Sequence, residues 1–184
     1  MTIAIDFDET LFATLERVLE VYNRRHNANL ELSQITTYNL YDSFDESVAD
    51  ALIELFVEKE VYSSLQPYKG SIKALKSLIE QGHEIYIATS TDVRNMEWKE
   101  ELLQTHFPFI PKKNLIRIHN KSLLNVDVMV EDNLDNLKNT FAERICFNQP
   151  WNIDKDADYV YSIYRINHWG EIGNIINNIE RMNK

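Results

Sequence analysis

The segment Ile3-Ala4-Ile5-Asp6-Phe7-Asp8-Glu9-Thr10 joins a short apolar run to two aspartates that lie two positions apart. The apolar run predicts a buried strand, and alternation along its extended exit puts the Asp6 and Asp8 carboxylates on one side. Two carboxylates held this close repel each other unless a cation or a proton lies between them. Open α/β sheets keep their ligands at the carboxyl ends of their strands, so the pair predicts a Mg²⁺ site with one aspartate free as a nucleophile.

Composition limits the class of partner. The 184 residues suffice for one core and a small insertion, and the net charge of −10 argues against nucleic-acid polymers and anionic membrane surfaces. The sequence has neither a signal-peptide pattern nor an apolar run of about 18 residues. It has a single cysteine, Cys146, for which a buried, inert thiol is expected. We therefore expect a cytoplasmic protein that binds a small molecule.

The four glycines of the chain form neither a dinucleotide-binding nor a P-loop motif. If the protein handles phosphate, it must use a metal, hydroxyl groups and a lysine instead.

Alternating strand and helix patterns predict an α/β fold with a doubly wound, Rossmann-like parallel sheet of about five strands. The expected strands are Thr2–Ile5, Glu84–Ala88, Leu115–Ile118, Val126–Val130 and Arg144–Phe147. Helices are expected over Pro67–Gln81, Asn95–Phe107 and Asn133–Asn139, and from His168 or Trp169 to about Arg181.

The stretch between the first two strands is longer than the roughly 30 residues of a plain crossover unit. It contains helical patterns at Phe12–His26 and Glu46–Glu58. We interpret residues 11–66 as a small helical cap inserted after the first strand, and residues 1–10 and 67–184 as the core.

Polar side chains follow the second and third strands. Thr89 and Ser90 fall at a strand-to-helix turn, where hydroxyl and N–H groups suit a phosphoryl oxygen, although taken alone they are better explained by a simple helix N-cap. Lys121 follows the third strand, where it could neutralise a phosphoryl group or be a solvated surface charge.

The fourth strand ends in the adjacent acids Glu131 and Asp132. With Asp6 and the Asp8 main chain they could complete an oxygen ligand shell around Mg²⁺. The alternative is that Asp132 or Asn133 caps the following helix. A calcium-binding loop starting at Asp6 is excluded, because Leu11 and Arg17 occupy its required Gly and Glu positions.

These groups follow separate strands in a fixed order, and that order resembles the four motifs of the haloacid dehalogenase superfamily. The matching residues are Asp6-Phe7-Asp8-Glu9-Thr10, Thr89, Lys121 and Glu131-Asp132. Dehalogenases lack the second aspartate, so Asp8 indicates the phosphohydrolase branch. Within it the chain is most similar to the 5′(3′)-deoxyribonucleotidases, through the inserted cap, Asn120-Lys121-Ser122 and the segments 147–152 and 165–172.

The resemblance implies that Asp6 is the nucleophile and forms an aspartyl phosphate, while Asp8 is the general acid and base. It implies that Asp6, the Asp8 carbonyl and Asp132 hold Mg²⁺, and that Glu131 lies just outside the shell of metal ligands. Thr89, Ser90 and Lys121 would hold the phosphoryl group. For a nucleoside leaving group, the cap aromatics Phe12, Tyr41 and Phe44 would cover the base, unless they are simply the core of the cap.

The expected function is removal of phosphate from (deoxy)nucleoside monophosphates, with a deoxynucleotide as the small partner. One alternative enzyme is a phosphatase or phosphomutase for a sugar phosphate or another small phosphomonoester. The non-enzyme alternatives are a phosphoacceptor signalling domain and a module that binds a phosphorylated ligand. The sequence leaves a homodimer open.

Overall fold

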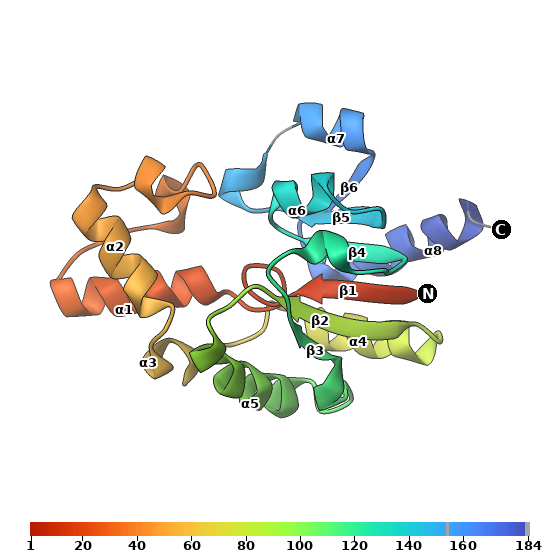
Figure 1. The fold of residues 1–184 in the computed structure, drawn as a ribbon, viewed down its shortest axis with the longest axis horizontal. Coiled ribbons are helices and arrows are strands. Elements are labelled where there is room, and N and C mark those ends of the chain that lie inside the picture. The colour runs from red at the N-terminus through yellow and green to blue at the C-terminus, as the bar shows by residue number, and fades with distance from the viewer. Residues whose placement is uncertain (154, 183–184) are drawn as a thin grey trace.

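The computed structural model describes residues 1–153 and 155–182, and its centre is one parallel sheet (Figure 1). The strand order is β3-β2-β1-β4-β5-β6, and every pairing is parallel. The strands are β1 (Thr2–Asp6), β2 (Glu84–Thr89), β3 (Leu115–Arg117), β4 (Val128–Glu131), β5 (Glu143–Phe147) and β6 (Ile163–Ile166). The predicted doubly wound fold is confirmed, and β6 adds a sixth strand to the five expected.

Helices cover both faces of the sheet. The larger cluster of buried apolar side chains lies between one face and the helices α4 (Ser71–Glu80), α5 (Met96–His106) and α8 (Ile172–Met182). A smaller cluster lies between the other face and the helices α6 (Leu134–Lys138) and α7 (Lys155–Tyr161). Cys146 belongs to the smaller cluster, and burial raises the pKa of its thiol to about 12. The expectation of a buried thiol is therefore confirmed.

Helix α4 begins later than the sequence predicts. The prediction put Pro67 at its start, but the helix begins at Ser71, after Gly70 in a left-handed conformation with a φ of +91°. Pro67 instead pairs with Phe12 in an antiparallel bridge. Residues 67–70 therefore bring the chain back into the core before the helix starts.

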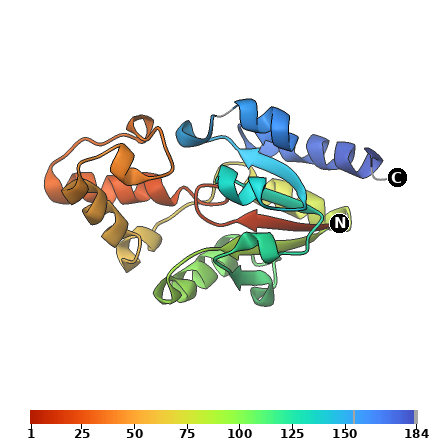
Figure 2. The ribbon, with the colours of Figure 1, turned by 45° about the horizontal axis from the view of Figure 1, so that its top comes forward.

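Three helices lie beyond the carboxyl ends of the strands (Figures 1 and 2). They are α1 (Thr14–His26), α2 (Glu46–Leu55) and α3 (Lys59–Tyr62), and α1 packs against both others. The chain leaves and re-enters the core at one place, because Tyr68 N–H donates to Leu11 O at 3.0 Å beside the Phe12–Pro67 bridge. The boundary at residues 11 and 66 stays a prediction.

Within residues 1–153 and 155–182, every helix falls short of the length and apolar character that a membrane-spanning helix needs.

Candidate active site

The predicted polar residues gather at the carboxyl edge of the sheet, where the strand order reverses. Strand β1 ends at Asp6, and its two neighbours β2 and β4 end at Thr89 and Glu131. After β1 the chain winds to one side through β2 and β3, and then crosses back to β4 on the other side. Where the strand order reverses in this way, the side chains at the strand ends face one common crevice. This explains why residues far apart in sequence meet here.

Lys121 lies between two of these carboxylates. Its side chain is buried, and its Nζ donates to Asp6 Oδ1 and, at 2.6 Å, to Glu131 Oε2. Burial alone would lower the pKa of this ammonium, but the charges of Asp6 and Glu131 raise the pKa above its usual value. Lys121 is therefore a permanent positive charge beside Asp6.

Three buried acids form a compact cluster. Asp6, Glu131 and Asp132 each offer one carboxylate oxygen, and these oxygens lie within 4.8 Å of one another. Burial, followed by the charge of Glu131, raises the pKa of Asp6 to about 7. The same two causes raise the pKa of Asp132 well above its usual range. One lysine cannot neutralise three carboxylates, so the cluster favours a cation.

The hydrogen bonds divide the cluster into two kinds of acid. Both oxygens of Glu131 accept hydrogen bonds, Oε2 from Lys121 and Asn136 and Oε1 from the Asn133 N–H. By contrast, no described group donates to Asp6 Oδ2 or to Asp132 Oδ1. Hard oxygen ligands suit Mg²⁺, so the residues fit this ion, with free oxygens on Asp6 and Asp132 and a supporting position for Glu131.

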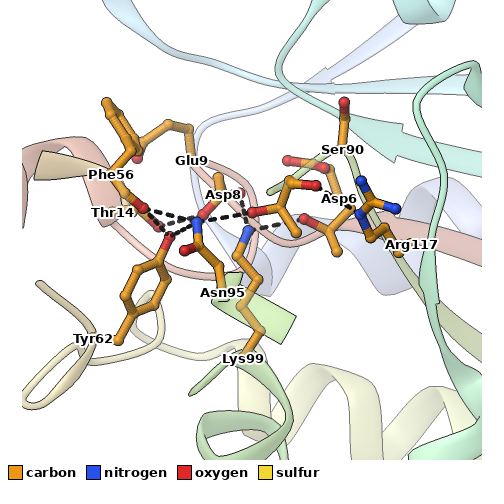
Figure 3. A network of polar contacts seen from close by, with 12 residues as sticks. Asp6, Asp8, Glu9, Thr14, Phe56, Tyr62, Ser90, Asn95, Lys99 and Arg117 are labelled. Atoms are coloured by element: carbon orange, nitrogen blue, oxygen red, sulfur yellow. Dashed lines mark hydrogen bonds and ion pairs between the residues drawn. The ribbon is translucent and has the colours of Figure 1, made fainter. Parts of the chain in front are cut away.

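Asp8 is held on both oxygens (Figure 3). Thr14 Oγ1, from α1, donates to Asp8 Oδ1 at 2.7 Å, and Lys99 Nζ, from α5, donates to Asp8 Oδ2. Lys99 is fully buried and also donates to Thr89 Oγ1 at 2.8 Å. The carboxylate of Asp8 is thereby fixed between a helix of the core and a helix of the cap.

Lys99 is a site residue that the sequence analysis missed. The available signal is its place on the apolar face of α5, three and four positions before the buried Leu102 and Leu103. A lysine in such a position needs a buried partner, because an unpaired buried charge is costly.

Thr89 and Ser90 occupy different environments. Thr89 is fully buried, and its hydroxyl accepts the hydrogen bond from Lys99 rather than reaching the cavity. Ser90 and Thr91 do line the cavity, as does Lys121. Of the three residues predicted to hold phosphate, the structure brings Ser90 and Lys121 to the cavity, while Thr89 lies beneath it.

A cavity of about 500 Å³ separates the carboxyl edge of the sheet from the three cap helices. Asp6, Asp8, Glu131 and Asp132 line its core side. Its cap side is mainly apolar, and the lining there includes Leu15, Ile35, Leu40, Ile53 and Phe56. Tyr38, Tyr62, Asn95 and Trp151 are further lining residues that the sequence analysis did not select.

The aromatic residues predicted to cover a base are not at this cavity. Phe12 is fully buried, with its ring stacked on Phe7 at a centroid distance of 4.5 Å, because its bridge to Pro67 turns it into the core. Tyr41 donates to Asp50 at 2.6 Å, and neither Tyr41 nor Phe44 belongs to the lining. The prediction is corrected here: Tyr38, three positions before Tyr41, is the cap aromatic that lines the cavity.

Glu9 anchors the loop that carries Asp8. Its φ of +57° is a costly backbone conformation for a residue other than glycine. Its buried carboxylate accepts a hydrogen bond from the Leu15 N–H at the start of α1, which holds the residue in this conformation. Its own carbonyl accepts from Gln149 Nε2 at 2.6 Å. Burial raises the pKa of the Glu9 carboxyl well above its usual range.

The fold is a doubly wound sheet in which Asp6 ends the first strand and Asp8 follows it, with a buried lysine and an acidic pair after later strands. Together these features define a phosphohydrolase of the haloacid dehalogenase superfamily. The family model described as "5′ nucleotidase, deoxy (Pyrimidine), cytosolic type C protein" matches residues 1–182. The chain therefore belongs to this family.

Individual proteins show the same likeness. A 5′(3′)-deoxyribonucleotidase of Bacillus subtilis (strain 168) is 26% identical over 174 residues, which cover 92% of this chain and 95% of that protein. A 5′(3′)-deoxyribonucleotidase of Clostridium acetobutylicum is 27% identical over 150 residues, which cover 80% and 81% of the two chains.

Among solved structures, a haloacid dehalogenase-like protein of unknown function from Agrobacterium tumefaciens superposes with a TM-score of 0.66. The alignment covers 97% of this chain and 98% of that one, at 11% sequence identity. At that identity the likeness supports the fold.

Proposed function

We propose that this protein is a Mg²⁺-dependent phosphohydrolase that removes phosphate from deoxynucleoside monophosphates through an aspartyl phosphate on Asp6. The observation that carries the proposal is the position of Asp6 at the cavity, hydrogen-bonded to the Lys121 ammonium and clustered with the acids Glu131 and Asp132. The names of the Bacillus and Clostridium relatives support a deoxynucleotide as the substrate.

In the proposed reaction Asp6 attacks phosphorus through its free Oδ2, and the bond to the leaving oxygen breaks. Asp8, in its protonated form, gives its proton to that oxygen and becomes the carboxylate that pairs with Lys99. This carboxylate later takes a proton from the water that attacks the aspartyl phosphate. Because Thr14 and Lys99 hold both oxygens of Asp8, the carboxyl keeps one orientation during both transfers.

Charge on the phosphoryl group is balanced by the core. Lys121 and the Ser90 hydroxyl line the cavity beside Asp6 and would bind phosphoryl oxygens. Mg²⁺, bound by Asp6, Asp132 and the Asp8 carbonyl, would supply further neutralisation of the anionic substrate. Glu131 holds Lys121 in place by accepting its second hydrogen bond.

The leaving group would occupy the apolar part of the cavity. Ile35, Leu40 and Phe56 come from the segment 11–66, which we propose as the cap over the core of residues 1–10 and 67–184. Residues 154, 183 and 184 of that core lie outside the described part of the chain. A nucleoside leaving group is uncharged, and its base has a flat face that can pack against such a lining. The cytoplasm is the proposed location.

The test is phosphate release from deoxynucleoside monophosphates, ribonucleoside monophosphates and sugar phosphates, each with Mg²⁺ or EDTA. We expect Mg²⁺-dependent release that favours deoxynucleotides and is lost in Asp6→Asn. Release from sugar phosphates alone would leave the chemistry but refute the substrate class. If Asp6→Asn released phosphate as fast as the parent protein, Asp6 could not be the nucleophile.

A further inference from the structure

We infer that Arg117 and His119 are positioning residues that turn the Ser90 hydroxyl proton towards the substrate phosphoryl group. The inference rests on the proposed function, because Ser90 is taken there as a phosphoryl ligand. Three contacts carry it. Ser90 Oγ lies 3.1 Å from His119 Nδ1, Arg117 Nη2 lies 3.0 Å from His119 Nε2, and Arg117 Nε donates to Thr91 O at 2.8 Å.

Arg117 fixes the proton on the imidazole. A guanidinium only donates hydrogen bonds, so His119 Nε2 must be the acceptor in its contact with Arg117. A neutral imidazole carries its one proton on the other nitrogen, and His119 Nδ1 is therefore the donor to Ser90 Oγ. The direction of both hydrogen bonds follows from the chemistry of Arg117.

This direction matters for Ser90. Its oxygen accepts a hydrogen bond from His119, so its own hydroxyl proton is not used in that contact and can point into the cavity that Ser90 lines. Phosphoryl oxygens only accept hydrogen bonds. With the opposite tautomer, Ser90 would donate its hydroxyl proton to His119 Nδ1. Only an oxygen lone pair would then face the phosphoryl group, and a lone pair repels an anion.

The rest of the local structure holds Arg117 in this role. Arg117 is the last residue of β3 and pairs in register with Thr89 of β2, directly before Ser90. Its bond to Thr91 O ties down the far side of Ser90. His119 lies two positions before Lys121 on the same loop, so the Ser90 hydroxyl and the Lys121 ammonium are placed by one segment.

The test is binding of inorganic phosphate, in the presence of Mg²⁺, measured by calorimetry. Loss of one hydrogen bond to a ligand weakens binding by about 3- to 10-fold. We expect a loss of this size for His119→Ala and for Ser90→Ala. In the Ser90→Ala background, His119→Ala should have no further effect, because His119 acts through Ser90.

His119→Asn is the matched variant, because the Asn side-chain nitrogen occupies the position of Nδ1 and keeps the donation to Ser90. We expect its phosphate affinity to stay within about twofold of the parent protein. The inference is overturned if His119→Asn binds as weakly as His119→Ala, or if His119→Ala weakens binding equally with and without Ser90.

Phosphate binding also separates this inference from the proposed function. If the protein released no phosphate from nucleotides, the proposed function would fail, yet the double-mutant pattern described above would still support the positioning role of Arg117 and His119. If nucleotides were hydrolysed but phosphate affinity did not respond to His119, the positioning role alone would be refuted.

Discussion

Lys99 and Asp8 form a hydrogen-bonded ion pair across 91 positions of sequence, and Lys99 has no solvent exposure. The pair joins helix α5 to the loop after β1. Because Lys99 also donates to Thr89 Oγ1, one ammonium ties together the ends of two neighbouring strands. Helix α5, which lies outside the opening motif, therefore positions Asp8, the second aspartate of that motif.

Replacing Lys99 with Met should lower kcat by about 10- to 100-fold with a smaller change in KM, since a misplaced Asp8 cannot transfer protons efficiently. Steady-state kinetics on a deoxynucleoside monophosphate would measure this. Lys113→Met, which removes an exposed lysine, is the control and should leave both constants unchanged. An unchanged kcat in Lys99→Met would contradict the positioning role.

Mg²⁺ should raise the melting temperature, and the rise should be larger at about pH 8 than at about pH 6. The raised pKa of Asp6, about 7, means that the metal-free folded protein holds more protons than the unfolded chain between roughly pH 4 and pH 7. Its stability falls as pH rises through that window, and Mg²⁺ binding, which needs the ionised acids, strengthens in the same direction.

At about 100 times its dissociation constant a ligand stabilises by about 2.7 kcal/mol, which corresponds to roughly 5 to 10 °C in a chain of this size. Thermal melts with Mg²⁺ or EDTA at the two pH values would measure the shift. Asp132→Asn should abolish most of it, whereas Asp135→Asn, at an exposed acid three positions further along the chain, should not. Equal shifts in both variants would argue against the cluster as the cation site.

Tyr38 should matter for substrate binding, while Tyr41 should not. Tyr38 lines the cavity, whereas Tyr41 is engaged with Asp50 outside it. An aromatic contact to a base is worth about 1–3 kcal/mol, so Tyr38→Ala should raise KM for a deoxynucleotide about fivefold or more. Tyr41→Ala is the matched control. If the two variants raised KM equally, Tyr38 would have no special contact with the substrate.

Asn95→Ala should destabilise the folded protein. The Asn95 Nδ2 lies 2.8 Å from Phe56 O at the end of α2, 3.2 Å from the Tyr62 hydroxyl and 3.1 Å from Thr91 Oγ1 (Figure 3). Loss of these buried contacts should lower the free energy of unfolding by about 1–3 kcal/mol. Denaturant titration would measure the change.

The comparison variant for Asn95 is Asn178→Ala, which makes the same substitution at an exposed position of α8. It should change the free energy of unfolding by less than about 0.5 kcal/mol. If Asn95→Ala were as stable as Asn178→Ala, the contacts between Asn95 and the cap would have no energetic weight.

Sequence patterns predicted the parts of this fold that depend on local or periodic signals. Strands β1 and β4 are buried on both faces and therefore appear as continuous apolar runs. Strand β6 was missed because it is a short edge strand in which Tyr164 and Arg165 are only partly buried. The strand-end acids and Lys121 were found because their order along the chain follows the order of the strands.

The remaining site residues depend on packing between distant segments. Lys99 and Asn95 acquire their roles from partners in the loop after β1, just past the end of α2 and in α3, which no local spacing reveals. Selection by residue type failed for Phe12, since an aromatic side chain suits a buried core and a ligand surface equally well. For Tyr38 and Tyr41, three positions apart, only the folded backbone decides which one reaches the cavity.

The bridge between Phe12 and Pro67, described above, has a consequence for how this protein could be changed. Because the chain departs and returns through one pair of adjacent residues, the segment between them can be exchanged without rethreading the sheet. The nucleophile and the buried acids stay behind in such an exchange, while Ile35, Leu40 and Phe56 go with the segment. Substrate selectivity could thus be transferred from one relative to another with this segment, provided that the incoming segment supplies a hydroxyl at the position of Thr14, which donates to Asp8.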